Sequence, residues 1–313
     1  MTESGQIAVI LNPKAAGDAY DAARIDRLRA IAGSRAVLFS IDDAERVHAV
    51  AEGIRERRAG VVAIIGGDGT VSSVLTALHR AYGRARWPHI AMLRGGTMNT
   101  VANAFGIPRG TPEELLARLL HGGARPVWPR ATLEVEGRLG FLFTAGAMVG
   151  FLDALYASER QLGKGPFAAF SLLSIVSVQA LIGGPTFRKV ETPLTATLKI
   201  DEAEHPERRY LAFAAGTVEQ VGLGFRPFRL ARECQDQFQI FAFHGSAQAL
   251  VREFPKIYRG QPFTRGFGFD PLARKLSIST QDGVVPYGLD GDLHRAQSPL
   301  YVRVGPKVEI VAL

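Results

Sequence analysis

The sequence has very little cysteine and no apolar targeting segment at its start. Cys234 is the one cysteine among 313 residues, so an internal disulfide is excluded, and a lone thiol is most often a small core residue. The first five residues contain no basic region followed by an apolar stretch, so we expect no signal peptide and a cytoplasmic location. Internal repeats and low-complexity segments are also lacking.

Positive charge is in excess but is not concentrated. The net charge is +7, and the arginines of the first hundred residues are scattered. No compact basic run and no aromatic-interleaved ribbon is present, so we do not expect nucleic-acid binding. A solvated basic surface is the simplest interpretation, and attraction to an anionic membrane surface is the next.

Two common phosphate-binding motifs are missing. The chain has no Gly-x4-Gly-Lys-Ser/Thr loop, and no Gly-x-Gly-x-x-Gly opens a helix after the first predicted strand. Any nucleotide must therefore be held in another way.

One glycine-rich turn is present between a predicted strand and a predicted helix. Residues 66–70 read Gly-Gly-Asp-Gly-Thr, after the β-branched run 61–65 and before apolar positions at helical spacing in 71–78. Such a turn brings the backbone close to a ligand, and the helix start favours phosphate. Asp68 would repel phosphate unless a divalent cation or a substrate hydroxyl lies between them. The motif indicates a nucleotide-metal or phosphoryl-transfer site, with a tight βα turn as the alternative.

Two further loops of this kind follow predicted strands. Residues 12–17 read Asn-Pro-Lys-Ala-Ala-Gly, after the apolar run 7–11, and precede a helical stretch over about 20–31. Residues 94–100 follow the run 90–93 and precede a short helix over 101–105. Ligands of open parallel sheets bind beyond the carboxyl ends of the strands, so we expect all three loops at one edge.

These motifs carry a family resemblance across almost the whole chain. The pieces are residues 12–17, 66–70, Gly-Thr-Met-Asn at 96–99 and Leu-Asp-Gly-Asp at 289–292. In order and spacing the chain resembles the diacylglycerol kinase catalytic-domain family, which includes bacterial lipid kinases and sphingosine and ceramide kinases. The resemblance implies transfer of the γ-phosphoryl of ATP to the hydroxyl of a lipid such as diacylglycerol or a sphingoid base, with Mg²⁺.

The resemblance also assigns roles to residues. Asp292 would be the general base, and Asp68 would bind Mg²⁺ and take part in catalysis. Asp236 is the nearest match to a structural Mg²⁺ site in the second domain. The residues expected to contact the nucleotide are Asn12, Pro13, Lys14, Gly17, Ser40, Gly66, Gly67, Gly69, Thr70, Thr97 and Asn99.

The sequence departs from the family pattern at three places. Ser72-Ser73 replaces the usual Asn-Glu, Asp292 replaces the usual Glu, and Gln237 replaces a Gly after Asp236. A catalytically weak nucleotide- or lipid-binding regulatory protein of the same fold is therefore the alternative. An NAD kinase-like enzyme lacks support because the Gly-Thr-Leu-Gly-Phe segment of that family is missing.

The pattern of elements predicts two domains. Apolar strands alternate with helical segments up to about residue 128, and strand-like runs dominate afterwards. We expect an α/β nucleotide-binding domain over 1–128 and a β-rich sandwich domain over 129–313. The resemblance implies that the last strand, about 308–312, returns to the first domain, and that the reaction occurs in a cleft between domains. The sequence does not decide whether the chain forms a homodimer.

Residues 165–187 form an uncharged stretch, and Pro166 and Pro185 bound its apolar part. Its apolar core, 167–182, approaches the ~20 residues of a spanning helix but is interrupted by three serines and a glutamine. A buried core helix, a helix that lines an acyl-chain groove or dips into the membrane surface, and a spanning helix are the alternatives. We expect a contribution to lipid access and a peripheral location at the inner membrane face.

Overall fold

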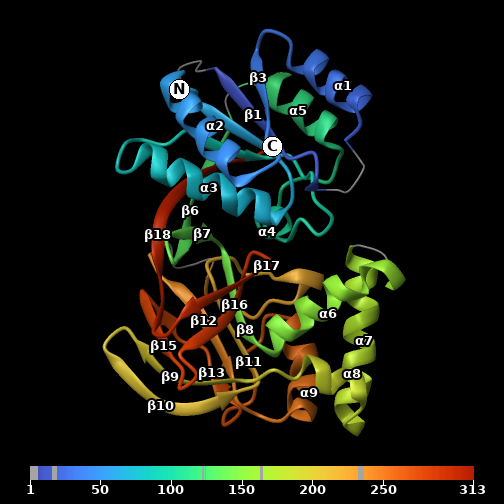
Figure 1. Cartoon of the computed structure of the whole chain (residues 1–313), viewed down its shortest axis with the longest axis vertical. Coiled ribbons are helices and arrows are strands. Elements are labelled where there is room, and N and C mark those ends of the chain that lie inside the picture. Colours follow the sequence, from blue (N-terminus) through green and yellow to red (C-terminus); the bar gives the residue numbers. More distant parts are fainter. Residues whose placement is uncertain (1–5, 16–19, 122, 124, 163–164, 232–235) are drawn as a thin grey trace. The chain divides into compact units, whose positions relative to one another are not determined.

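The computed structural model describes residues 6–15, 20–121, 123, 125–162, 165–231 and 236–313 (Figure 1). Gly17 and Cys234 lie outside the described residues. The chain separates into two compact units, and each is described by itself. Unit 1 contains residues 1–130 and 307–313, and unit 2 contains residues 131–306.

Unit 1 is built on a parallel sheet of buried strands. The strands lie in the order β5-β4-β1-β3, and each is a short apolar run, as expected for a sheet covered on both faces. The run predicted at 61–65 is a strand with those bounds. The strands are β1 (Ile7–Leu11), β3 (Ala36–Ser40), β4 (Val61–Ile65) and β5 (His89–Met92).

Helices cover both faces of this sheet. Alternate strand residues such as Val9, Ala63 and Ala91 pack in one core with α1 and α5, while α2 and α3 pack together on the other face. The arrangement is a three-layer α/β fold. The helices are α1 (Ala22–Ala32), α2 (Ala44–Glu56), α3 (Asp68–Tyr82), α4 (Thr100–Ala104) and α5 (Pro112–His121).

The last strand belongs to both units. β18 (Leu300–Val311) pairs with β15 of unit 2 over residues 300–303 and pairs with β5 of unit 1 at Ile310. Val308, Ile310 and Val311 are buried. The chain therefore completes the sheet of unit 1 with residues that come after the whole of unit 2.

Unit 2 contains two packed β-sheets. Its core lies between β8, β11, β12 and β16 on one side and β6, β9, β15 and β18 on the other. The strands other than β18 are β6 (Val127–Val135), which begins in unit 1, β7 (Arg138–Gly140), β8 (Leu142–Gly146), β9 (Leu194–Ile200), β10 (Ala203–Tyr210), β11 (Ala212–Gly216), β12 (Phe238–Phe243), β13 (Gly268–Phe269), β14 (Leu272–Ala273), β15 (Lys275–Ser279), β16 (Val284–Leu289) and β17 (Asp292–Gln297).

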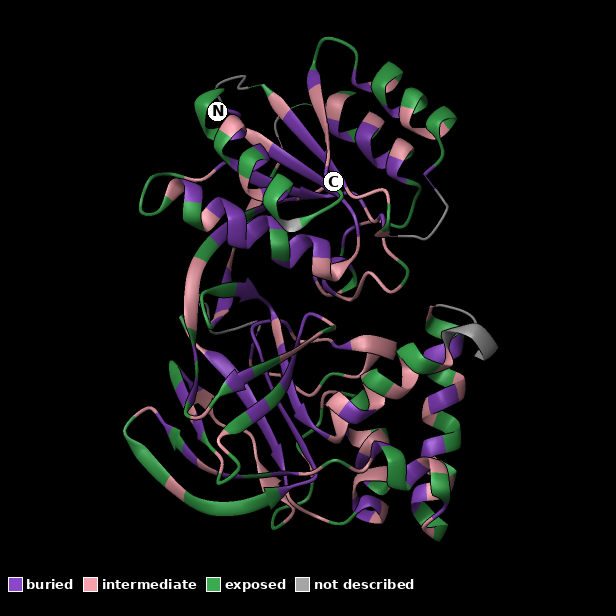
Figure 2. Cartoon of the chain, viewed as in Figure 1, coloured by how far each residue is buried: buried purple, intermediate pink, exposed green. Residues whose placement is uncertain are grey.

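A helical layer covers the second face of one sheet, so β11 and β12 are buried throughout (Figure 2). Phe213 and Ala215 face the core between the sheets, while Ala212 and Ala214 face the helices. The prediction of an α/β domain followed by a β-rich domain is confirmed, although it did not include most of this layer. The layer consists of α6 (Ala147–Leu162), α7 (Pro166–Ile182), α8 (Pro185–Val190) and α9 (Ala247–Tyr258), with a short 3-10 turn, η1 (Gly222–Gly224).

Among the described residues, no helix has both the length and the apolar character needed to cross a bilayer. The stretch predicted at 167–182 forms α7, which has 17 residues. Its buried side contributes Leu172, Val176 and Ala180 to the core beneath the helices.

Candidate functional site

The strand registers of unit 1 bring several loops to one edge. Leu11 at the end of β1 pairs with Ser40 at the end of β3 and with Ile65 at the end of β4, while Met92 of β5 pairs with Ile64. The loops that begin at residues 12, 66 and 94 therefore start side by side, at the carboxyl edge where parallel sheets bind ligands.

Two pairs of glycines let neighbouring loops touch through their backbones. A Cβ on Gly95 would lie 2.5 Å from the amide nitrogen of Gly66, and a Cβ on Gly96 would lie 2.2 Å from Cα of Gly67. The Gly95 N–H also donates to the Gly66 carbonyl at 3.0 Å. Glycine is required at 95 and 96 because any side chain would push the two loops apart.

The first loop is tied to the same edge by Asn12. Its Nδ2 donates to Oγ1 of Thr70 at 3.0 Å, and its Oδ1 accepts from the backbone N–H of Lys14 at 3.0 Å. Pro13 lies in the turn between them. The Lys14 ammonium is exposed and donates to the Asp42 carbonyl at 3.0 Å. The Asp42 carbonyl is a neutral group, so this contact does not neutralise the charge of Lys14.

Helix α3 begins inside the glycine-rich turn. Gly67 is its N-cap and provides no side-chain cap, and Asp68, Gly69 and Thr70 form its first turn. The first N–H groups of a helix have no partner within the helix, and the helix dipole is positive there. Backbone donors, the helix start and Lys14 together form a cradle suited to a phosphate group.

Asp68 is engaged with the neighbouring loop. Its Oδ2 accepts from the Thr100 N–H at 2.8 Å and its Oδ1 from the Val101 N–H at 2.9 Å, at the start of α4. These donors disperse the negative charge that would otherwise repel phosphate, and they offset that charge without a metal ion. The role of Asp68 in binding Mg²⁺ stays a prediction.

The loop between β5 and α4 is folded on its own side chains. Asn99, in the left-handed conformation at φ 49°, accepts from the Gly96 N–H at 3.1 Å and donates to the Gly96 carbonyl at 2.6 Å. Arg94, at φ 47°, donates to the Ile107 carbonyl and, at 2.8 Å, to Oδ1 of Asn103. Burial and the nearby Arg109 lower the pKa of Arg94. Asp68 opposes these effects. The sequence analysis did not identify Arg94 as a residue that holds this loop through hydrogen bonds.

Of the other predicted nucleotide contacts in unit 1, Thr97 is exposed at the tip of that loop, and Ser40 is half-buried at the end of β3. The structure thus brings Asn12, Gly66, Gly67, Thr70 and Asn99 into one connected set of loops. It leaves Thr97 open to solvent.

In unit 2, the predicted base follows a tight hairpin turn. β16 and β17 are joined by Asp290 and Gly291, both at positive φ (48° and 94°), and Leu289 pairs with Asp292. Asp290 is 5% exposed, and its carboxylate accepts from the N–H groups of Phe141 and Leu142 at 2.9–3.1 Å. These bonds fix the turn against the start of β8. Asp290 therefore positions the residue that follows the turn.

The other side of the turn is held by helix α6. The Tyr156 hydroxyl donates to the Gly291 carbonyl at 2.7 Å, and α6 packs on both β16 and β17. The sequence analysis identified neither Tyr156 nor the contact of Asp290 with residues 141–142, because each partner lies more than a hundred residues away.

Asp292 has an unusual electrostatic environment. Its side chain is exposed, yet the surrounding protein removes enough water from the carboxyl group to raise its pKa, against the effect of His294 and Arg138. Burial and Arg138 lower the pKa of His294, while Asp292 opposes them. The ring of His294 lies 5.2 Å from that of Tyr287. A carboxylate with a raised pKa is a better proton acceptor than an ordinary aspartate.

The predicted structural metal site at Asp236 gains no support from the described residues. Asp236 is exposed in the turn before β12. Among the residues that the structure describes, no group of three His, Cys, Asp or Glu side chains could hold a metal ion. A metal at Asp236 stays a prediction.

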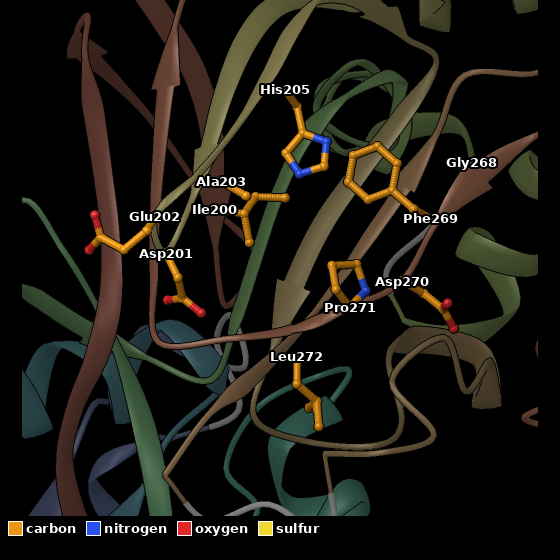
Figure 3. Close-up of a pocket in the computed structure, with 10 residues that line it drawn as sticks. All are labelled: Ile200, Asp201, Glu202, Ala203, His205, Gly268, Phe269, Asp270, Pro271 and Leu272. Atoms are coloured by element: carbon orange, nitrogen blue, oxygen red, sulfur yellow. The ribbon is translucent and has the colours of Figure 1, made fainter.

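A pocket of about 800 Å³ in unit 2 lies between the β9–β10 turn and residues 268–272 (Figure 3). The rings of His205 and Phe269 stack there at 5.0 Å. Asp201 already accepts from the N–H groups of residues 274 and 275, and Asp270 accepts from Arg229 and Gln239. With both carboxylates engaged, we assign this pocket no role in phosphoryl transfer.

Comparison with known proteins finds similarity in both sequence and fold. Residues 6–128 match the model of the diacylglycerol kinase catalytic domain, which confirms the predicted resemblance. The fold is similar to that of a diacylglycerol kinase from Bacillus anthracis strain Sterne, with a TM-score of 0.66 and 16% identity over 99% of this chain and 97% of that chain. A candidate diacylglycerol kinase from the same strain gives a TM-score of 0.69 and 16% identity with the same coverage. No curated protein matches the sequence.

Proposed function

We propose that this chain, with its diacylglycerol kinase catalytic domain, is an ATP-dependent lipid kinase. The single observation that carries the proposal is the cradle at the start of α3, where two glycine loops meet through their backbones. Such a cradle suits the phosphates of a nucleotide. The acceptor is a lipid alcohol such as diacylglycerol or a sphingoid base, and the location is the cytoplasmic side of the membrane.

In the proposed reaction, the hydroxyl oxygen of the lipid attacks the γ-phosphorus of ATP. The bond between that phosphorus and the β–γ bridging oxygen breaks, ADP leaves, and the hydroxyl proton passes to the carboxylate of Asp292. The raised pKa of Asp292 supports this role. Asp290 and Tyr156 act as positioning residues, since both hold the turn that precedes Asp292.

The residues of the cradle fit a nucleotide better than they fit a metal cage. Backbone N–H groups, Asn12 and Lys14 are donors for phosphate oxygens. Mg²⁺ usually binds through one or two carboxylates together with substrate phosphates. We infer that Mg²⁺ is held mainly by the phosphates of ATP, with help from the carboxylate of Asp68. The ion would supply charge neutralisation.

A second candidate function is a catalytically weak nucleotide- or lipid-binding regulatory protein. The engagement of both Asp68 oxygens by the start of α4 favours it, since that carboxylate has less capacity for a metal. Ser73, where the family has an acid, is an exposed residue of α3 and offers no replacement.

A transfer assay with radiolabelled ATP and a panel of lipid alcohols in mixed micelles separates the two. We expect a labelled lipid product, and we expect Asp292→Asn to lower kcat by about 10²–10⁴ while the affinity for ATP changes little. Asp292→Glu should keep or raise activity. ATP binding without transfer to any acceptor would favour the regulatory protein, and an Asp292→Asn variant with most of its kcat would place the base elsewhere.

A further inference from the structure

Helix α7 is apolar on both faces, and the described structure covers one of them. Ala168, Leu172 and Val176 are buried against α6, α8 and α9. On the other face large side chains are exposed, and Figure 2 shows the two kinds of residue alternating along the helix. The exposed residues are Phe167 (78%), Phe170 (61%), Ile175 (43%), Val178 (61%), Leu181 (50%) and Ile182 (77%). We call these six the apolar stripe of α7.

The stripe follows helical spacing, so its side chains lie on one side of the helix, with the exposed Ser174 between Phe170 and Val178. The steps from residue 167 to 170, 178, 181 and 182 keep them on a single side of the helix. A helix that is apolar all round is normally buried, and a contiguous exposed apolar surface of this kind usually marks an interaction site. The stripe therefore indicates an interaction surface.

Three polar side chains of α7 form hydrogen bonds within the protein. The hydroxyls of Ser174 and Ser177 donate to the carbonyls of Phe170 and Leu173 at 2.8 and 2.7 Å. Gln179 accepts from the Thr186 N–H at 2.6 Å. Because these donors and acceptors are used internally, an apolar medium could cover the helix at a lower desolvation cost than the sequence suggests.

The charged side chains of α7 and α8 are both positive. Residues 165–190 contain two charged side chains, Arg188 and Lys189, and both are exposed on α8, which packs against α7. An apolar face with cations at its rim complements the interface of an anionic bilayer, where acyl chains lie beneath negative headgroups. A second copy of the chain would bring the same cations together.

The stripe is also connected to the turn that carries the proposed base. α7 packs on α6, α6 packs on β16 and β17, and Tyr156 of α6 donates to the Gly291 carbonyl. Figure 1 shows α6 and α7 side by side in unit 2. A lipid surface that contacts α7 would thus contact the helical layer that supports the turn before Asp292.

We propose that the apolar stripe of α7, with Arg188 and Lys189, docks on the surface of an anionic phospholipid membrane. The helix lies in the plane of the interface, because its 17 residues span only about 25 Å. The proposal names the surface from which the acceptor is taken, so it rests on the proposed lipid kinase function for its purpose. The docking itself depends only on the stripe and its cations.

Vesicle binding by the full chain tests the proposal. Sedimentation with phosphatidylcholine vesicles is compared with sedimentation with vesicles that contain phosphatidylglycerol as well. We expect binding to the anionic vesicles, a loss of tenfold or more in Phe170→Ser/Val178→Ser, and a loss of about fivefold per cation in Arg188→Gln/Lys189→Gln. Tyr301→Ser in β18 and Lys275→Gln in β15 change exposed residues away from α7. They are matched controls and should bind like the parent.

Each outcome has a clear meaning. Unchanged binding by Phe170→Ser/Val178→Ser, with an unchanged circular dichroism spectrum, would overturn the proposal. So would a parent dimer that this variant converts to a monomer without loss of vesicle binding, because the occupant would then be a second copy. Equal binding of the parent to both kinds of vesicle would overturn the assignment to anionic lipid.

A kinase assay separates this proposal from the proposed function. The stripe variants should phosphorylate a water-soluble short-chain diacylglycerol like the parent and lose activity on diacylglycerol embedded in anionic vesicles. If the parent binds vesicles through α7 but phosphorylates no lipid, the docking stands and the kinase assignment fails. Equal loss of activity on the soluble and the embedded acceptor would contradict docking as the role of the stripe.

Discussion

At the residue scale, the charges around Asp292 determine how the enzyme should respond to pH. Loss of water raises the pKa of the Asp292 carboxyl, while His294 and Arg138 lower it. A general base works only when it is deprotonated, so activity should fall on the acid side as the pH passes through this pKa. The acid limb of kcat should therefore lie above the ordinary aspartate value of about 3.9.

Arg138→Gln tests this electrostatic account. Removal of a cation that lowers the pKa must raise it, so we expect the acid limb of the kcat–pH profile to shift to higher pH. Arg295→Gln is the matched control. Arg295 is exposed on β17, the strand that contains Asp292 and His294, but it points to the opposite face from these two residues. A shift to lower pH in Arg138→Gln, or an equal shift in the control, would contradict the assignment.

Asp68 offers a second test at this scale. Its carboxylate caps the start of α4 through two backbone N–H groups, so Asp68→Ala should lower the free energy of unfolding by about 0.5–2 kcal/mol. Asp68→Asn keeps one acceptor and should recover part of this loss in urea unfolding.

The effect of Mg²⁺ distinguishes a cap from a ligand. If Asp68 acts only as the cap, Asp68→Asn should bind ATP with the same dependence on Mg²⁺ as the parent, measured by isothermal titration. If it also helps to hold the ion, the Mg²⁺ dependence should move to higher concentration in Asp68→Asn. A variant as stable as the parent would disprove the cap.

At the scale of elements, α9 carries a buried carboxylate that links stability to pH. Glu253 is 5% exposed and accepts from Thr264, through its N–H at 3.1 Å and its hydroxyl at 2.6 Å, and from Lys256 at 3.1 Å. Burial alone would raise the pKa of Glu253, and the hydrogen bonds outweigh it and hold the pKa below its ordinary value. They tie α9 to the loop that follows it.

A depressed pKa in the folded state gives stability that is present above the unfolded pKa and is lost as the pH falls through the folded value. Glu253→Gln should thus lower the free energy of unfolding by about 1–3 kcal/mol at pH 7. The difference from the parent should shrink below about pH 4, in urea titrations at several pH values. Glu207→Gln, at an exposed position of β10, should show neither effect. A difference that grows on acidification would contradict the mechanism.

The elements show which parts of this fold the sequence can predict. β4 has the predicted bounds and α7 begins one residue early, because an unbroken apolar run between turn residues is a strong local signal. β10 was not predicted because it is almost entirely exposed and has no apolar alternation. α9 contains Pro255, which weakens the local signal for a helix.

The candidate site also has features that the sequence can predict and features that it cannot. The glycine loops at the carboxyl edge of the sheet follow from motifs and parallel strand order, and both are local features. The partners of the two acidic motifs are distant in sequence. Asp68 bonds to residues 32 and 33 positions away, and Asp290 to residues 148 and 149 positions away. Only the tertiary structure shows that each of these carboxylates holds a distant segment through backbone hydrogen bonds.

At the scale of the whole molecule, β18 makes each unit depend on one strand that follows the rest of unit 2 in the sequence. Leu300 pairs with Ile278 in unit 2, and Ile310 pairs with Ile90 in unit 1. Both side chains are fully buried or nearly so. Truncation of either to alanine should cost about 2–5 kcal/mol.

Hydrogen exchange can assign that cost to one unit. Ile310→Ala should raise amide exchange mainly in β1, β4 and β5 and weaken ATP binding, whereas Leu300→Ala should raise it mainly in β9 and β15. The two variants are matched in position along one strand and control for each other. Equal exchange changes in both units for both variants would show that the chain unfolds as a single body.

The place of β18 in the chain also constrains how the protein is made. Residues 1–130 leave the ribosome long before residues 307–313, so a nascent unit 1 exposes the β5 edge until β18 has been synthesised. An unpaired apolar strand edge is a template for aggregation, and domains otherwise fold as they emerge. Premature termination anywhere in unit 2 should therefore release a chain that chaperones retain. Nucleotide binding then also reports that translation has passed β18.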